Sequence, residues 1–173
     1  MLFKLRNILG KKKWMLIFFI IFIVVEALMV YSLRDINTLE FLELQITMSK
    51  DKFLEIINSW NENQIKAYHK HFFFDFIYLS IYPLFLFSII SYFFNRAHVV
   101  NKGSFFLILP FIVAFFDFIE NMLHLNFIWT DYSQARVYFM VSGIFSIQKW
   151  VLAFVSLYII VVLFLRLTIL HKK

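Results

Sequence analysis

The sequence lacks cysteine and is poor in glycine and proline, and each shortage excludes a class of site. With no cysteine, the chain has no disulfide, no thiolate metal site and no cysteine nucleophile. It has only three glycines and two prolines among 173 residues. No glycine-rich phosphate-binding loop and no serine-centred nucleophile elbow can be found in it.

Charged residues are also scarce. They make up 16% of the chain, whereas hydrophobic residues make up 62% and the mean hydropathy is +0.78. A soluble domain is about half apolar, so this excess must face lipid. The net charge of +6 comes mainly from bases that flank apolar segments, as at the cytoplasmic ends of membrane spans. The sequence contains no basic helix with interleaved aromatic residues, so it does not predict nucleic-acid binding.

Four apolar segments predict the fold class. They cover about residues 14–33, 72–94, 104–129 and 138–165. About 20 helical residues, at about 1.5 Å each, cross a hydrocarbon core of about 30 Å. No small-residue cleavage site follows the first segment, so we interpret it as a retained helix rather than a signal peptide. The sequence therefore predicts one all-α membrane domain over residues 1–173, a four-transmembrane-helix bundle.

The distribution of bases predicts the orientation. Ten Lys and Arg residues lie in the N-terminal tail, the connection 95–103 and the C-terminal end, against six in the other two connections. The positive-inside rule then places both termini in the cytoplasm. We expect a multi-pass protein of the cytoplasmic membrane, whose first partner is the lipid bilayer.

The first outer connection, residues 34–71, carries helix signals. Ser49 can cap a helix with apolar residues at helical spacing. Asn61, with Gln64 three residues later, has the pattern of a second helix start. We expect short amphipathic helices on the outer membrane face, with Phe53 and Trp60 in the interface. The alternative is a lid that packs on the bundle.

Polar residues within the spans predict a candidate site. Its residues are Asp75, Asp117, Glu120, Asn121 and Lys149. Helical spacing places them on faces that avoid lipid, in the outward half of the bundle. With Glu26, four carboxylates face one lysine, so protonated carboxyls, a charged histidine or a bound cation must balance the charge. We expect Lys149 to pair with Asp117 or Glu120, held by Asn121.

A metal site is a weaker hypothesis. His71, Asp75, Glu120 and His124 offer nitrogen and oxygen ligands. The Glu-x-x-His pattern of di-iron bundles is missing. The sequence therefore identifies no cofactor.

Three functions are compatible with such a site. The first is binding or modification of a lipid-like molecule, with the carboxylates as acid–base or ligand groups. The second is a non-enzymatic scaffold or accessory subunit, in which polar contacts only hold the helices together. The third is a component of a proton- or ion-coupled transporter. Neither catalysis nor oligomeric state follows from the sequence.

Three short patterns carry a resemblance. They are Asp75 followed by Tyr82-Pro83, the Asp-x-x-Glu-Asn sequence of 117–121, and Lys149-Trp150. In these residues the chain resembles a group of uncharacterised bacterial four-span integral membrane proteins, over roughly 45–165. The resemblance implies a fold and the location of a site, and it implies no activity.

Overall fold

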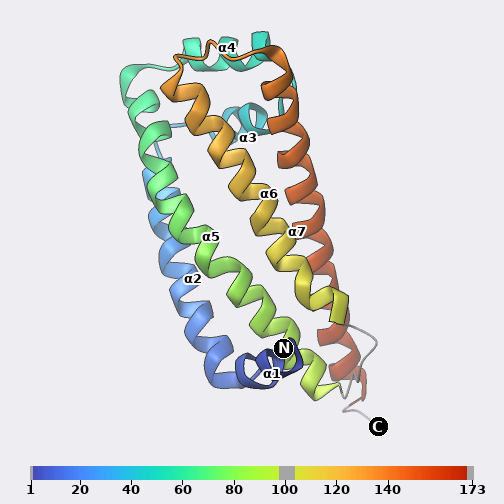
Figure 1. Ribbon diagram of the computed structural model, residues 1–173. Coiled ribbons are helices and arrows are strands. Elements are labelled where there is room, and N and C mark those ends of the chain that lie inside the picture. Colours follow the sequence, from blue (N-terminus) through green and yellow to red (C-terminus); the bar gives the residue numbers. More distant parts are fainter. Residues whose placement is uncertain (1, 98–103, 171–173) are drawn as a thin grey trace.

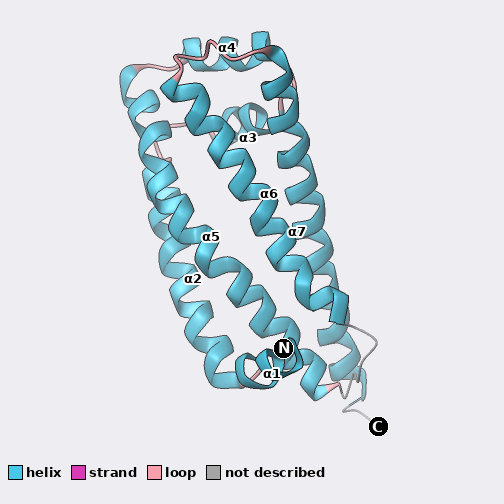
Figure 2. Ribbon diagram, in the orientation of Figure 1, coloured by secondary structure: helices cyan, strands magenta, loops and turns pink. Residues whose placement is uncertain are grey.

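The computed structural model describes residues 2–97 and 104–170, and within these ranges helices are joined by short loops and no strand occurs (Figure 2). The seven helices of this part are α1 (Leu2–Leu9), α2 (Lys12–Ser32), α3 (Thr38–Ile46), α4 (Lys50–Ser59), α5 (Glu62–Arg96), α6 (Ser104–Trp129) and α7 (Arg136–Leu170). The predicted all-α bundle, with two short helices in its first long connection, is confirmed.

Four helices, α2, α5, α6 and α7, are long and apolar enough to cross a membrane. The most apolar 18-residue stretch of each has a mean hydropathy between 1.9 and 2.6. They run side by side as a bundle, with α2 against α5 and α6 against α7 (Figure 1). Large apolar side chains such as Ile20 and Phe154 are more than half exposed, which suits a surface in contact with lipid. These properties are those of a multi-pass membrane protein.

Helix α5 differs from the sequence prediction. Asn61 and Gln64 form the expected capping box, but the helix that they start does not end before the second apolar segment. It continues without a break to Arg96, because no proline or glycine interrupts the chain between Glu62 and the span. The prediction of a separate short helix here was wrong. Tyr68 and His71 therefore lie on the same rigid helix as Asp75.

Helices α3 and α4 cross one end of the bundle (Figure 1); we call these two helices the cap. Asn37 and Ser49 are their N-caps, and each accepts backbone hydrogen bonds from the first turn. The side chains of Phe53 and Trp60 are almost fully buried, and the Phe53 ring packs on Phe127 and Phe139. Phe53 and Trp60 thus belong to a lid packed on the bundle rather than to an interfacial surface helix.

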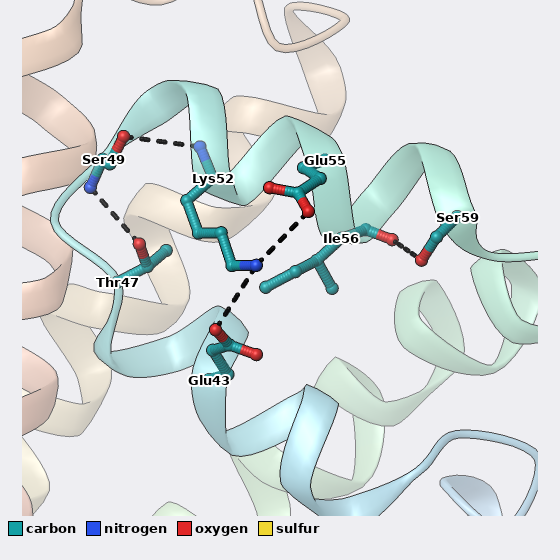
Figure 3. Close-up of polar contacts among 7 residues, drawn as sticks. All are labelled: Glu43, Thr47, Ser49, Lys52, Glu55, Ile56 and Ser59. Carbon is teal, nitrogen blue, oxygen red and sulfur yellow. Dashed lines mark hydrogen bonds and ion pairs between the residues drawn. The ribbon is translucent and has the colours of Figure 1, made fainter.

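One lysine joins the two helices of the cap on their exposed side. Lys52 Nζ lies 3.5 Å from Glu43 and 3.4 Å from Glu55 (Figure 3). Glu43 and Glu55 raise the pKa of Lys52 above its ordinary value. Because all three side chains are solvent-exposed, these ion pairs orient the cap more than they stabilise it.

The interior is layered along the bundle. Next to the cap lies an apolar layer that includes Leu44, Phe53, Tyr68 and Phe127. A second layer, around Leu79, Tyr82 and Val113, lies near the middle of the bundle. At the far end, Leu2 and Leu9 of α1 pack on a third layer around Phe87, Phe94 and Leu163. The polar residues of the candidate site lie between the first and second layers.

Candidate functional site

Lys149 on α7 is the centre of the buried polar cluster, which we define as Asp75, Asp117, Glu120, Asn121 and Lys149. Its Nζ lies 2.7 Å from Asp117 Oδ1 and 2.7 Å from Glu120 Oε2, both on α6. The three side chains are between 1% and 9% exposed. The sequence predicted one of these pairs, and the structure contains both. Two carboxylates thus share one ammonium group.

Asn121 joins α6 to α5. Its side-chain nitrogen donates a hydrogen bond to Asp75 Oδ2. The sequence predicted that Asn121 would hold the lysine ion pair, and this detail was wrong: the amide serves the other carboxylate. Asp75 therefore has a neutral donor as its partner, whereas Asp117 and Glu120 have a cation. The fourth intramembrane carboxylate, Glu26 on α2, faces Tyr78 instead of Lys149.

The two histidines lie between this cluster and the cap. His124 Nδ1 is hydrogen-bonded to the Tyr68 hydroxyl at 2.8 Å, and His71 Nδ1 is bonded to the backbone oxygen of Tyr68. Two aromatic rings of the cap pack edge-on against these histidines. The distance between ring centres is 5.1 Å for Phe41 and His71 and 5.5 Å for Phe53 and His124. Both imidazoles are thus fixed in place by α5 and the cap.

The metal hypothesis finds no support in this geometry. In residues 2–97 and 104–170, no three His, Asp or Glu side chains come together in a group that could hold a metal ion. His71, Asp75, Glu120 and His124 share one region, but their polar contacts go to Tyr68, Asn121 and Lys149. We derive no metal chemistry from them.

Three buried hydroxyl groups of α5 and α7 lack hydrogen-bond partners in the described part of the chain. They belong to Tyr82, Ser142 and Ser146, all at most 5% exposed. Tyr82 faces Asp117 and Ser146 faces Glu120, yet neither contact has the geometry of a hydrogen bond. Buried polar groups in proteins are almost always satisfied by protein, water or ligand. This region therefore contains more hydrogen-bonding groups than the described part of the chain pairs with one another.

A groove of about 390 Å³ lies on the outside of the bundle at the same level as the cluster. It is formed by α6 and the start of α7, and its lining is mainly apolar, with Asn126 and Gln134 as polar members. Phe118, Met122 and Tyr138 on its walls are 40–46% exposed. No residue of the cluster lines it, although the lining residues Ile119 and Met122 directly flank Glu120 and Asn121 in the sequence.

Sequence reasoning missed Tyr68 and Gly143. Tyr68 lies one helical turn before His71 and Phe72, so the spacing of the buried stripe could have included it had α5 been recognised as continuous. Gly143 is the place where α7 approaches the cap: a Cβ there would lie 2.5 Å from the Thr47 oxygen. Nothing in the sequence alone marks that contact.

Comparisons with protein-family models, curated proteins and solved structures find no match to this chain. The resemblance to four-span bacterial proteins with an Asp-x-x-Glu-Asn motif stays a prediction.

Proposed function

We propose that this multi-pass membrane protein binds a lipid-like molecule, whose polar head occupies the cluster in the outward-facing half of the bundle. The observation that carries the proposal is the unmatched polar capacity of the cluster. Three carboxylates face one lysine, and the two buried hydroxyl groups that face these carboxylates, those of Tyr82 and Ser146, lack partners in the described part of the chain. Such a site favours a head group that brings hydrogen-bond donors or a positive charge.

The cluster residues have distinct roles in this proposal. Lys149 holds Asp117 and Glu120 in fixed positions through two ion pairs. Asp75 is held by a single neutral amide, so it has free acceptor capacity for a ligand donor. If the ligand is also modified, Asp75 is the carboxylate best placed for acid–base chemistry, with Asn121 as its orienting group.

The proposed access route is through the bilayer, along the α6–α7 groove. The cap packs on the two histidines at the nearer end of the bundle, which favours an entrance from the lipid side over one from water. The groove is apolar, faces the lipid side and occupies the same stretch of α6 as the cluster. Its occupant in this proposal is the hydrocarbon tail of the same lipid-like molecule.

Lipid analysis tests the proposal. The full chain and Asp75→Asn are purified in mild detergent, and co-purified lipids are quantified by mass spectrometry. We expect at least one species enriched with the wild-type chain and depleted by a factor of at least about ten in Asp75→Asn, since a lost charge-assisted hydrogen bond contributes about 1.5–3 kcal/mol. The matched control is Ser88→Ala, a buried serine without a partner, far from the cluster. Identical lipid profiles for folded wild-type and Asp75→Asn protein would contradict the proposal.

A scaffold or accessory subunit is the second candidate, and one observation favours it. The contacts of Lys149 and Asn121 join α5, α6 and α7 at one level, as polar groups do when they fix helix packing. In that case the pair Glu120→Gln with Lys149→Met preserves function. A folded double variant without function would count against this candidate.

Proton or ion coupling has less support. From residue 84 to 95 in α5, 104 to 116 in α6 and 150 to 165 in α7, the sequence contains no Asp, Glu, His or Lys. A relay of such groups would therefore stop halfway along the bundle. Proteoliposome flux above that of empty vesicles would revive this function.

A further inference from the structure

The end of the bundle opposite the cap carries a buried cation that pairs with no carboxylate in the described part of the chain. Arg6 lies on α1, which crosses this end (Figure 1), and it is only 9% exposed. Its Nε donates to Asn95 Oδ1 at 2.8 Å, and its guanidinium lies 5.5 Å from the centre of the Phe94 ring. Burial lowers the pKa of the Arg6 guanidinium from its ordinary value, although arginine remains charged at any physiological pH.

No acidic side chain is available to this arginine. Within the described ranges, no Asp or Glu lies within 4 Å of Arg6. The remaining residues, 1, 98–103 and 171–173, include neither Asp nor Glu. All eleven acids of the chain lie between Glu26 and Asp131, in the bundle half nearer the cap or in the connections at that end. A buried cation without a counter-ion is costly, and an anion from outside the chain would offset this cost.

Helix α1 is built to lie at a lipid surface. Leu2, Arg6 and Leu9 share the face that packs on the bundle. Phe3 and Ile8, on its flanks, are 47% and 44% exposed, and Lys4 is exposed as well. Apolar flanks with basic residues are typical of helices that lie in the plane of a membrane interface. Lys11, Lys12 and Lys13 follow directly and are also exposed.

Gly10 and Asn95 fix the position of the guanidinium. A Cβ on Gly10 would lie 2.6 Å from Asn95 Nδ2 and 2.9 Å from Ser91 Cβ. Only glycine allows α1 to turn into α2 against this face of α5. The arginine is therefore held at a defined place by the fold and is not a freely moving surface base.

We propose that Arg6 binds the phosphate group of an anionic membrane lipid at the end of the bundle where α1 lies. A planar guanidinium matches a phosphate with two parallel hydrogen bonds. Its Nε is used by Asn95, which leaves the two terminal nitrogens for the lipid. The exposed lysines of residues 4 and 11–13 add general attraction to an anionic surface. This site is independent of the function proposed for the polar cluster.

The experiment uses the full chain in nanodiscs of phosphatidylcholine, with or without phosphatidylglycerol. Bound phosphatidylglycerol is counted by native mass spectrometry, and the midpoint of thermal unfolding is measured. We expect the wild-type chain to retain phosphatidylglycerol and to gain thermal stability from it. Arg6→Gln should bind it about fivefold more weakly, since one base near the surface contributes about 1 kcal/mol. Arg6→Lys keeps the charge but loses the two parallel hydrogen bonds of the guanidinium. Its affinity for phosphatidylglycerol should lie between those of the wild type and Arg6→Gln.

Asn95→Asp keeps the test decisive if Arg6→Gln does not fold. It supplies a carboxylate beside Arg6, so this variant should fold without anionic lipid and lose its preference for phosphatidylglycerol. Arg166→Gln, at an exposed base near the same end, is the control and should change binding less than Arg6→Gln.

Three results would overturn the proposal. One is unchanged phosphatidylglycerol binding in Arg6→Gln, and another is unchanged binding in Asn95→Asp. The third is an equal gain in stability from inorganic phosphate in discs of phosphatidylcholine alone, which would make a soluble anion the ligand.

Discussion

Gly143 of α7 lies so close to Thr47 that a Cβ at this position would be 2.5 Å from the carbonyl oxygen of Thr47. The backbone of the connection between α3 and α4 therefore rests directly on α7. Gly143→Ala should push the cap away from the bundle and destabilise the protein by about 1–3 kcal/mol, the usual cost of overpacking. The measurement is the midpoint of thermal unfolding in detergent. Val151→Leu, an enlargement at a lipid-exposed position of the same helix, should have little effect.

Removal of Lys149 should be much more damaging than removal of one of its partners. Lys149→Met leaves Asp117 and Glu120 buried without a cation, at a cost of about 3–5 kcal/mol. Glu120→Gln leaves the Asp117 pair intact and should cost less. The triple variant Asp117→Asn, Glu120→Gln and Lys149→Met should recover most of the lost stability. Denaturant unfolding of the four proteins measures this order, and a Lys149→Met protein as stable as wild type would contradict it.

The hydroxyl of Tyr68 should contribute to stability through His124. Tyr68→Phe removes the 2.8 Å hydrogen bond and leaves His124 Nδ1 buried without that partner. We expect a loss of about 1–3 kcal/mol, seen as a lower thermal midpoint. Tyr158→Phe is the matched control, because Tyr158 is 70% exposed on α7. Equal midpoints for the two variants would show that the hydrogen bond is not needed.

The turn between α6 and α7 contains residues with positive φ, and this predicts a stabilising change. Asp131 has φ of 48° at the end of α6, where Tyr132 N donates to Phe127 O and Asp131 N donates to Ile128 O. This is the helix end at which glycine is preferred. Asp131→Gly should raise stability by about 0.5–1 kcal/mol, or about 1–4 °C. A lowered midpoint would mean that the Asp131 side chain itself matters.

The orientation can be tested because the chain has no cysteine. Asn63→Cys at the start of α5 and Asn7→Cys in α1 replace exposed residues at opposite ends of the bundle. If the N-terminus is cytoplasmic, a membrane-impermeant maleimide added to intact cells should label Cys at position 63 and leave position 7 unlabelled. The reverse pattern would place the polar cluster in the inward half.

The spans and the ion pair of the site follow from simple rules applied to the sequence. Four long apolar segments and the helical spacing of residues 117–124 were enough to predict that Lys149 pairs with Asp117 or Glu120, and the structure contains both pairs. The hydrogen-bond partner of Asn121 could not be predicted, because Asp75 and the ion pairs of Lys149 both lie in the interior of the bundle. Which of them the amide meets depends on the rotation of α5. Helix α1 was missed because it has only eight residues and its packing depends on Asn95, far away in the sequence.

The unbroken course of α5 has a mechanical consequence. At about 1.5 Å per residue, its 35 residues measure about 52 Å, well beyond a hydrocarbon core of about 30 Å. Its first turns carry Tyr68 and His71 up against the cap. Because Tyr68, His71 and Asp75 lie on one continuous helix, a displacement of the cap that shifts the start of α5 would also shift Asp75.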